Sequence, residues 1–121
     1  MEKNRRLIIN KLDKLWRDAV NSVGSCDYCG SSSRKLNAHH IVTRSVSALR
    51  WKMLNGICLC SYHHSLSSDF SAHKTPLEFH AFLEKKYPGR YDKLMIMKRN
   101  KIGTKDFQLK AIYQNFEYFS S

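Results

Sequence analysis

Cysteine and histidine are the residue types in this chain best suited to chemistry, and several occur at metal-ligand spacing. Cys26-x-x-Cys29 forms one pair and Cys60-x-x-His63 forms a second, with residues 30–59 between them. Each spacing lets two side chains close on one tetrahedral zinc ion. We therefore expect these four side chains to hold a structural zinc ion, whose binding free energy becomes folding free energy.

Cys58 is the remaining cysteine. In an extended strand Cys58 and Cys60 point to the same face, so Cys58 could compete for the metal ion. The turn expected after Cys60 favours the Cys60/His63 pair instead. We therefore expect Cys58 to be a buried small apolar residue.

The other histidines distinguish an enzyme from a binding module. His39 and His40 lie in a predicted strand, and His64 directly follows the expected zinc ligand His63. Adjacent strand residues face opposite ways, so His39 and His40 cannot share one role. One can hold a metal ion while the other addresses a substrate.

These side chains need secondary structure to position them. Apolar residues recur at three- and four-residue spacing from Arg5 to Val23, which predicts an amphipathic helix ended by Gly24. Extended runs at 36–43 and 56–60 predict a β-hairpin with a long basic connection. A helical turn is expected at 63–68.

A capping box marks the start of a later helix. Thr75-Pro76-Leu77-Glu78 has proline at the first helical position, and the Thr75 hydroxyl is expected to accept a backbone N–H while Glu78 reaches back. The helix should run to about Tyr87, because Pro88-Gly89 breaks it. Further helices are expected over residues 90–100 and after Thr104.

Length and charge predict one small basic domain. The 121 residues include 21 Lys and Arg against 10 Asp and Glu, giving a formal charge of +11 that favours a polyanionic partner, most simply nucleic acid. No apolar stretch is long enough to span a membrane, and the N-terminal segment is amphipathic. We therefore expect a cytoplasmic protein that uses its cysteines for metal rather than for disulfides. A redox role for Cys26-x-x-Cys29 leaves the histidines unexplained.

Taken together, the motifs resemble the HNH endonucleases of the ββα-metal superfamily, especially small phage-type proteins with zinc knuckles. The resemblance covers residues 26–95. It is carried by four segments, 26–29, 38–45 (AHHIVTRS), 55–64 (NGICLCSYHH) and 72–79 (AHKTPLEF). The spacings 55 − 40 = 15 and 64 − 55 = 9 suit a family whose His, Asn and His lie on two strands and the following helix.

The resemblance implies an α+β fold with a ββα-metal (His-Me finger) core and a structural zinc site, flanked by N- and C-terminal helices, as a single domain over residues 1–121. It implies a metal-dependent DNA endonuclease that leaves 5′-phosphate and 3′-hydroxyl ends. His40 would be the general base. Asn55 would bridge the hairpin and fix His40, although in some relatives this Asn sits at the metal.

The resemblance also implies a catalytic divalent cation. Its ligands would be His39, His64 and His73. Relatives often place the last histidine one helical turn after the preceding one, whereas His73 follows His64 by nine residues, so residues 65–72 would have to loop out and Asp69 is the alternative ligand. Three imidazoles without a carboxylate make a softer site, so Mn²⁺, Co²⁺ or Ni²⁺ should support activity as well as Mg²⁺.

Basic residues near the motif are candidates for DNA contacts. Arg44, Arg50 and Lys52 are expected to contact the DNA backbone, while Trp51 packs in the core. Family association suggests phage packaging or recombination proteins as partners. The alternative class is a zinc-stabilised nucleic-acid-binding module without catalysis, for which His40→Ala would change no function. Further basic residues toward the C-terminus could extend the footprint: Lys93, Lys98, Arg99, Lys101, Lys105 and Lys110.

Overall fold

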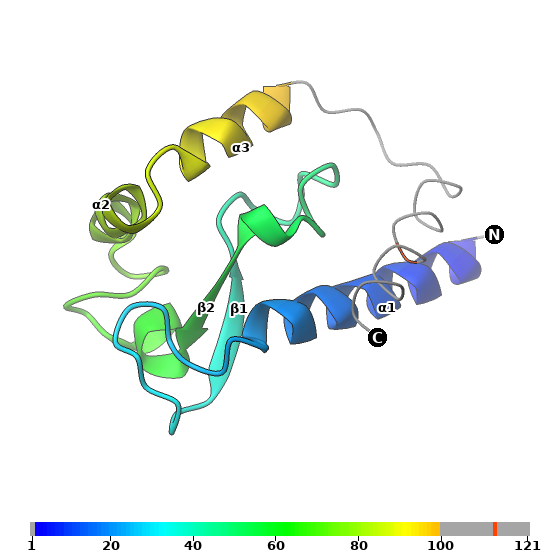
Figure 1. The fold of residues 1–121 in the computed structure, drawn as a ribbon. Helices are drawn as coiled ribbons and strands as arrows, with labels where there is room; N and C mark the ends of the chain where they lie inside the picture. The colour runs from blue at the N-terminus through cyan, green and yellow to red at the C-terminus, as the bar shows by residue number, and fades with distance from the viewer. Residues whose placement is uncertain (1, 100–112, 114–121) are drawn as a thin grey trace.

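A computed structural model describes residues 2–99 and Tyr113 of the chain. Within these residues the protein is an α+β structure in which a two-stranded antiparallel hairpin lies between helix α1 on one side and helices α2 and α3 on the other (Figure 1). The elements in chain order are α1 (Glu2–Asn21), β1 (Leu36–His40), the 3₁₀ turn η1 (Met53–Asn55), β2 (Gly56–Cys60), the π-helical turn η2 (Tyr62–Leu66), α2 (Pro76–Lys86) and α3 (Arg90–Arg99).

Helix α1 covers one face of the hairpin. Its buried residues Leu12, Trp16 and Val20 recur every four positions and pack against Trp51 and Cys58. The helix starts earlier than the sequence pattern predicts and ends two residues sooner, at Asn21. The predicted stop at Gly24 has a physical basis, because this residue has a φ of 80° and donates its N–H to the Asn21 carbonyl at 3.0 Å.

The hairpin fixes the relative positions of the candidate site residues. Its register pairs His39 with Ile57 and His40 with Gly56. Strand β2 matches the predicted range, but the prediction that β1 continues to residue 43 is wrong, because Val42 has both backbone groups bonded to the Asn55 side chain. The strand pairing therefore ends at His40.

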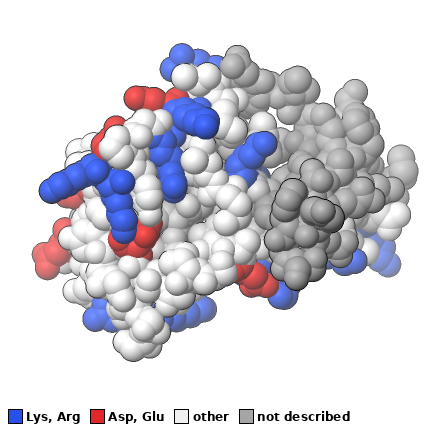
Figure 2. Space-filling model, viewed as in Figure 1, with Lys and Arg blue, Asp and Glu red and all other residues white. Residues whose placement is uncertain are grey.

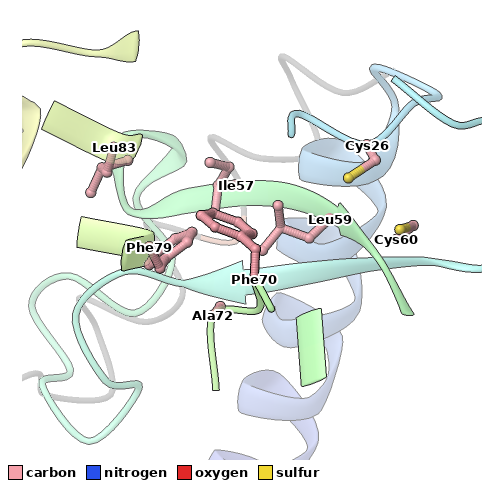
Figure 3. Close-up of a cluster of buried hydrophobic side chains, with 8 residues drawn as sticks. All are labelled: Cys26, Ile57, Leu59, Cys60, Phe70, Ala72, Phe79 and Leu83. Atoms are coloured by element: carbon pink, nitrogen blue, oxygen red, sulfur yellow. The ribbon is translucent and has the colours of Figure 1, made fainter. Parts of the chain in front are cut away.

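Strand β2 is buried along its whole length because helices cover both of its faces. Ile57 and Leu59 pack with Phe70, Phe79 and Leu83 in the cluster drawn in Figure 3. This packing joins the loop after η2 and helix α2 to the hairpin.

The predicted burial of Cys58 is confirmed, because 2% of this residue is exposed. Cys58 and Cys60 have different packing partners. Cys58 packs against α1, whereas Cys60 lies in the cluster that contains Leu59 (Figure 3). The strand ends at Cys60, and the chain turns into η2 at Tyr62.

Helix α2 begins at Pro76, as the capping box predicts, but the predicted cap by the Thr75 hydroxyl is wrong. That hydroxyl donates to the Ser71 carbonyl at 3.0 Å and accepts the Ser71 N–H at 2.9 Å, so it is already engaged by the preceding loop. Helix α3 follows the break at Gly89, where φ is 82°. The expected last helix and three of the C-terminal basic residues, Lys101, Lys105 and Lys110, lie outside the described residues.

The long connection between the strands, residues 41–55, is itself packed. Val42, Val46 and Leu49 form a buried cluster with Leu94 of α3. Trp51 is buried, as predicted, against α1. Among the residues that the structure describes, no helix combines the length and apolar character needed to cross a bilayer.

Candidate metal centres

The four predicted zinc ligands lie together at the end of the hairpin where β2 stops. The donor atoms of Cys26, Cys29, Cys60 and His63 are all within 4.8 Å of one another and could hold a metal ion. The Cys29 and Cys60 sulfurs are 3.9 Å apart, and Cys60 Sγ lies 3.3 Å from His63 Nδ1. Since Zn–S bonds of about 2.3 Å in a tetrahedron separate two sulfurs by roughly 3.8 Å, the geometry is consistent with structural zinc.

A tight turn presents the first pair of ligands. Gly30 donates to the Cys26 carbonyl at 2.8 Å, and its φ of 75° is in the left-handed region that glycine tolerates. The Asp27 N–H binds the Cys58 carbonyl at 2.8 Å, which attaches the turn to β2. The turn and the end of the strand therefore bring both ligand pairs together.

Local hydrogen bonds favour the metal-binding form of Cys60. Burial alone would raise the pKa of this thiol, but hydrogen bonds from the His63 backbone, the Arg34 guanidinium and the His63 ring lower the pKa to about 6. The Arg34 Nη1 lies 3.9 Å from the sulfur. Because the thiolate is the form that ligates metal, these contacts prepare the site for a cation.

A second group of side chains that could hold a metal ion includes His64, the neighbour of His63. His39 on β1, His64 on η2 and His73 before α2 bring their ring nitrogens within 4.8 Å of one another, and the Nε2 atoms of His64 and His73 are 3.1 Å apart. This cluster, as the structure describes it, consists of imidazoles. Asp69 is exposed and outside it, so of the two alternatives the fold brings His73 to the site.

Backbone pairing explains how His73 returns to the cluster. The His73 N–H binds the His64 carbonyl at 3.1 Å, and the Ala72 N–H binds the His63 carbonyl at 3.0 Å. Between these segments, Phe70 is buried in the core and its N–H is accepted by the Ser67 hydroxyl at 3.2 Å. Residues 65–72 therefore loop out and come back against η2.

Burial favours the neutral form of His39 and His64. Desolvation, followed by the charges of His64 and His73, lowers the pKa of His39 to about 3. Desolvation, followed by His73, also lowers the pKa of His64. A neutral imidazole carries the lone pair that binds a cation, so the lowered pKa values of His39 and His64 favour metal binding by these two rings.

His40 is held on the α1 side of the hairpin. Its ring stacks on Trp16, with centroids 3.9 Å apart and planes 9° apart. Its Nε2 lies 3.0 Å from the Arg50 carbonyl oxygen, which can only accept, so Nε2 carries the proton and Nδ1 carries the lone pair. Desolvation is the main cause that lowers the pKa of His40.

One cavity is lined both by His40 and by the three histidines of the cluster. Its volume is about 420 Å³, and its lining includes His40 together with His39, His64 and His73. The rings of these adjacent residues have different neighbours, because His39 contacts Phe79 and His40 stacks on Trp16. His40 therefore lines the same cavity as a cluster that could hold a cation.

Asn55 is fully buried and organises the connection between the strands. Its Oδ1 accepts the Val42 N–H at 2.7 Å, and its Nδ2 donates to the carbonyls of Val42 at 3.0 Å and Leu49 at 3.2 Å. Its amide thus bridges the connection just after His40.

The three basic residues expected at DNA have different environments. Arg44 is exposed and lines the histidine cavity. The Lys52 side chain is exposed, while its carbonyl accepts Trp16 Nε1–H at 2.9 Å. The Arg50 guanidinium is bonded to the Asp13 carboxylate at 2.7 and 2.9 Å, so a phosphate would have to compete with that ion pair.

Comparison with known proteins assigns no family to the chain: no family model, no curated protein and no solved structure matches it.

Two residues that surround His40 were not predicted from the sequence. Asp13 binds the Arg50 side chain, and Trp16 stacks on the His40 ring. They lie three residues apart on α1 and therefore share a helix face directed at the hairpin. The signal in the sequence was an acidic residue on an otherwise apolar face, next to Leu12. Sequence spacing alone could not indicate that this face meets His40.

Proposed function

We propose that this protein is a metal-dependent DNA endonuclease of the HNH type, with a ββα-metal core formed by β1, β2 and the histidine-bearing turn η2. The observation that carries the proposal is the shared cavity in which His40 lies beside the cluster of His39, His64 and His73. The separate Cys/His group supports it, because a structural zinc site would hold the strand end and η2 in place.

The donor set of the second cluster fits a divalent cation. The three imidazoles converge from different elements, and their nitrogens come within 4.8 Å of one another. A cation bound there would polarise the scissile phosphate and compensate the charge that builds on the departing 3′ oxygen. Imidazole ligands suit Mn²⁺, Co²⁺, Ni²⁺ and Zn²⁺ better than they suit Mg²⁺.

His40 is the residue in the cavity best placed to act as a general base. With Nε2–H donated to the Arg50 carbonyl, Nδ1 can accept a proton from water. The resulting hydroxide attacks phosphorus, the bond from phosphorus to the 3′ oxygen breaks, and that oxygen takes a proton from solvent. The products are a 5′-phosphate and a 3′-hydroxyl.

The substrate proposed is DNA, approached through its backbone. The formal charge of +11 favours a polyanion, and Arg44 lines the cavity where a phosphate would enter. Figure 2 shows Lys and Arg side chains over α2 and α3 with Asp and Glu side chains among them, so the positive charge on this face is dispersed. Contacts to the backbone carry little sequence information, so we expect weak sequence preference.

Cation-dependent cleavage of supercoiled plasmid tests the proposal. The zinc-loaded protein should nick or linearise plasmid when Mn²⁺, Co²⁺, Ni²⁺ or Mg²⁺ is added, and a chelator that removes only the weakly bound cation should stop it. End labelling should find 5′-phosphates. If the protein binds the plasmid but cleaves it with none of these cations, the non-catalytic zinc-stabilised binding module replaces the nuclease.

A further inference from the structure

Helix α1 is tied to the connection between the strands by a group of side-chain hydrogen bonds. Asp13 Oδ1 accepts Arg50 Nε–H and Trp51 Nε1–H, both at 2.9 Å, and Asp13 Oδ2 accepts Arg50 Nη2–H at 2.7 Å. One turn along the helix, Trp16 Nε1–H donates to the Lys52 carbonyl at 2.9 Å. Three consecutive residues of the connection are therefore anchored to α1.

The same segment supplies the carbonyl that orients His40. The Arg50 side chain binds Asp13, while the Arg50 carbonyl oxygen lies 3.0 Å from His40 Nε2. The other restraint on the ring is the stack on Trp16. The plane of the imidazole and the nitrogen that holds its proton are thus both set by contacts that depend on α1.

We propose that Asp13 is a positioning residue for His40. By holding the Arg50 guanidinium at two points, Asp13 fixes the Arg50 carbonyl that accepts His40 Nε2–H, and this leaves Nδ1 as the proton acceptor. The catalytic part of this inference rests on the proposed nuclease function, whereas the orientation of His40 does not.

The ion pair is suited to this role because it is rigid and shielded. The Arg50 and Asp13 side chains are 21% and 26% exposed, and a two-point contact between guanidinium and carboxylate fixes orientation as well as distance. The pair between Lys14 and Asp18 on the same helix differs, since these side chains are 70% and 59% exposed. Asp18→Asn is therefore a matched control for Asp13→Asn.

The experiment compares zinc-loaded full-length wild type with Asp13→Asn, Asp18→Asn and Arg50→Lys. Long-range ¹H–¹⁵N spectra of the histidine rings report which nitrogen of His40 holds the proton, independently of any activity. Steady-state plasmid nicking then separates kcat from KM. Arg50→Lys keeps the charge but not the two-point contact, so it provides a second route if Asp13→Asn proves too unstable to study.

We expect wild type and Asp18→Asn to show His40 as the Nε2–H tautomer, and Asp13→Asn to show a mixture. The kcat of Asp13→Asn should fall on the order of 10- to 100-fold with KM for DNA unchanged, because a small displacement of a reacting group costs rate rather than binding. Arg50→Lys should give a smaller loss in the same direction.

Two results overturn the inference. One is an Asp13→Asn protein whose His40 tautomer matches that of Asp18→Asn. The other is an altered tautomer with unchanged kcat, since the orientation that Asp13 gives His40 would then have no effect on cleavage. If the wild type cleaves no plasmid, the nuclease function fails, and the spectra still decide whether Asp13 orients His40.

Discussion

His63 and His64 are consecutive residues of η2, yet they face different metal-ligand groups. His63 Nδ1 lies 3.3 Å from Cys60 Sγ, while His64 Nε2 lies 3.1 Å from His73 Nε2. One short turn therefore contributes a ligand to each group. The two groups therefore share the backbone of η2.

Because both groups share η2, we expect that loss of the Cys/His group of Cys26, Cys29, Cys60 and His63 weakens cation binding at the cluster of His39, His64 and His73. Cys29→Ser should lower the melting temperature and reduce the affinity of the cluster for Ni²⁺, measured by calorimetry, by on the order of tenfold. As a control, His73→Ala should reduce Ni²⁺ affinity while the bound zinc stays stoichiometric. Unchanged Ni²⁺ affinity in a zinc-depleted protein would mean that η2 is ordered without the first site.

The third cation ligand can be tested with two substitutions in one loop. His73→Ala should abolish tight Ni²⁺ binding, because only two imidazoles remain in the cluster. Asp69→Ala should leave the affinity unchanged, since Asp69 is exposed and outside the cluster. A larger decrease in Ni²⁺ affinity for Asp69→Ala than for His73→Ala would show that the loop rearranges when the cation binds.

Asn55→Ala should destabilise the fold by about 2–4 kcal/mol, because the buried backbone groups of Val42 and Leu49 would lose their partners. Urea unfolding of the zinc-loaded protein measures the change. Asn10→Ala, at an exposed position of α1, is the matched control and should stay within about 0.5 kcal/mol of wild type. Equal stability of the two variants would refute the bridging role.

Gly56→Ala should also destabilise the protein, by about 1–3 kcal/mol. A Cβ at this position would overlap Val20 Cγ2 and lie 2.8 Å from Trp16 Cζ2, so α1 would have to move away from the hairpin. Adding Val20→Ala should relieve the closest overlap and recover part of the loss, a coupling that a double-mutant cycle in urea detects. Additive losses would indicate that α1 and the hairpin do not meet at this point.

Local patterns in the sequence were sufficient to predict most of the elements. The apolar spacing of α1, the extended run of β2 and the proline at the start of α2 each depend on neighbours in the chain, and each element was found. The zinc-type ligand set was also predictable, because Cys26-x-x-Cys29 and Cys60-x-x-His63 fix the distances within each pair.

Long-range contacts account for what the sequence did not predict. The early end of β1 depends on the Asn55 side chain, and the uncapped start of α2 depends on Ser71 competing for the Thr75 hydroxyl. The contacts of His40 with Trp16 and Arg50 join segments that are far apart in the chain. A helical or strand period carries no information about such contacts.

The proposed role of His40 as the base in the histidine cavity can be measured by the nicking of supercoiled plasmid with matched histidine variants. His80 on α2 contacts Tyr91 and lies outside the described lining of the cavity, so zinc-loaded His80→Ala should nick like wild type at saturating cation. His40→Ala should lose about 10²- to 10⁴-fold in rate while it retains zinc and binds DNA. A His40→Ala protein that nicks plasmid as fast as His80→Ala would show that His40 is not the base.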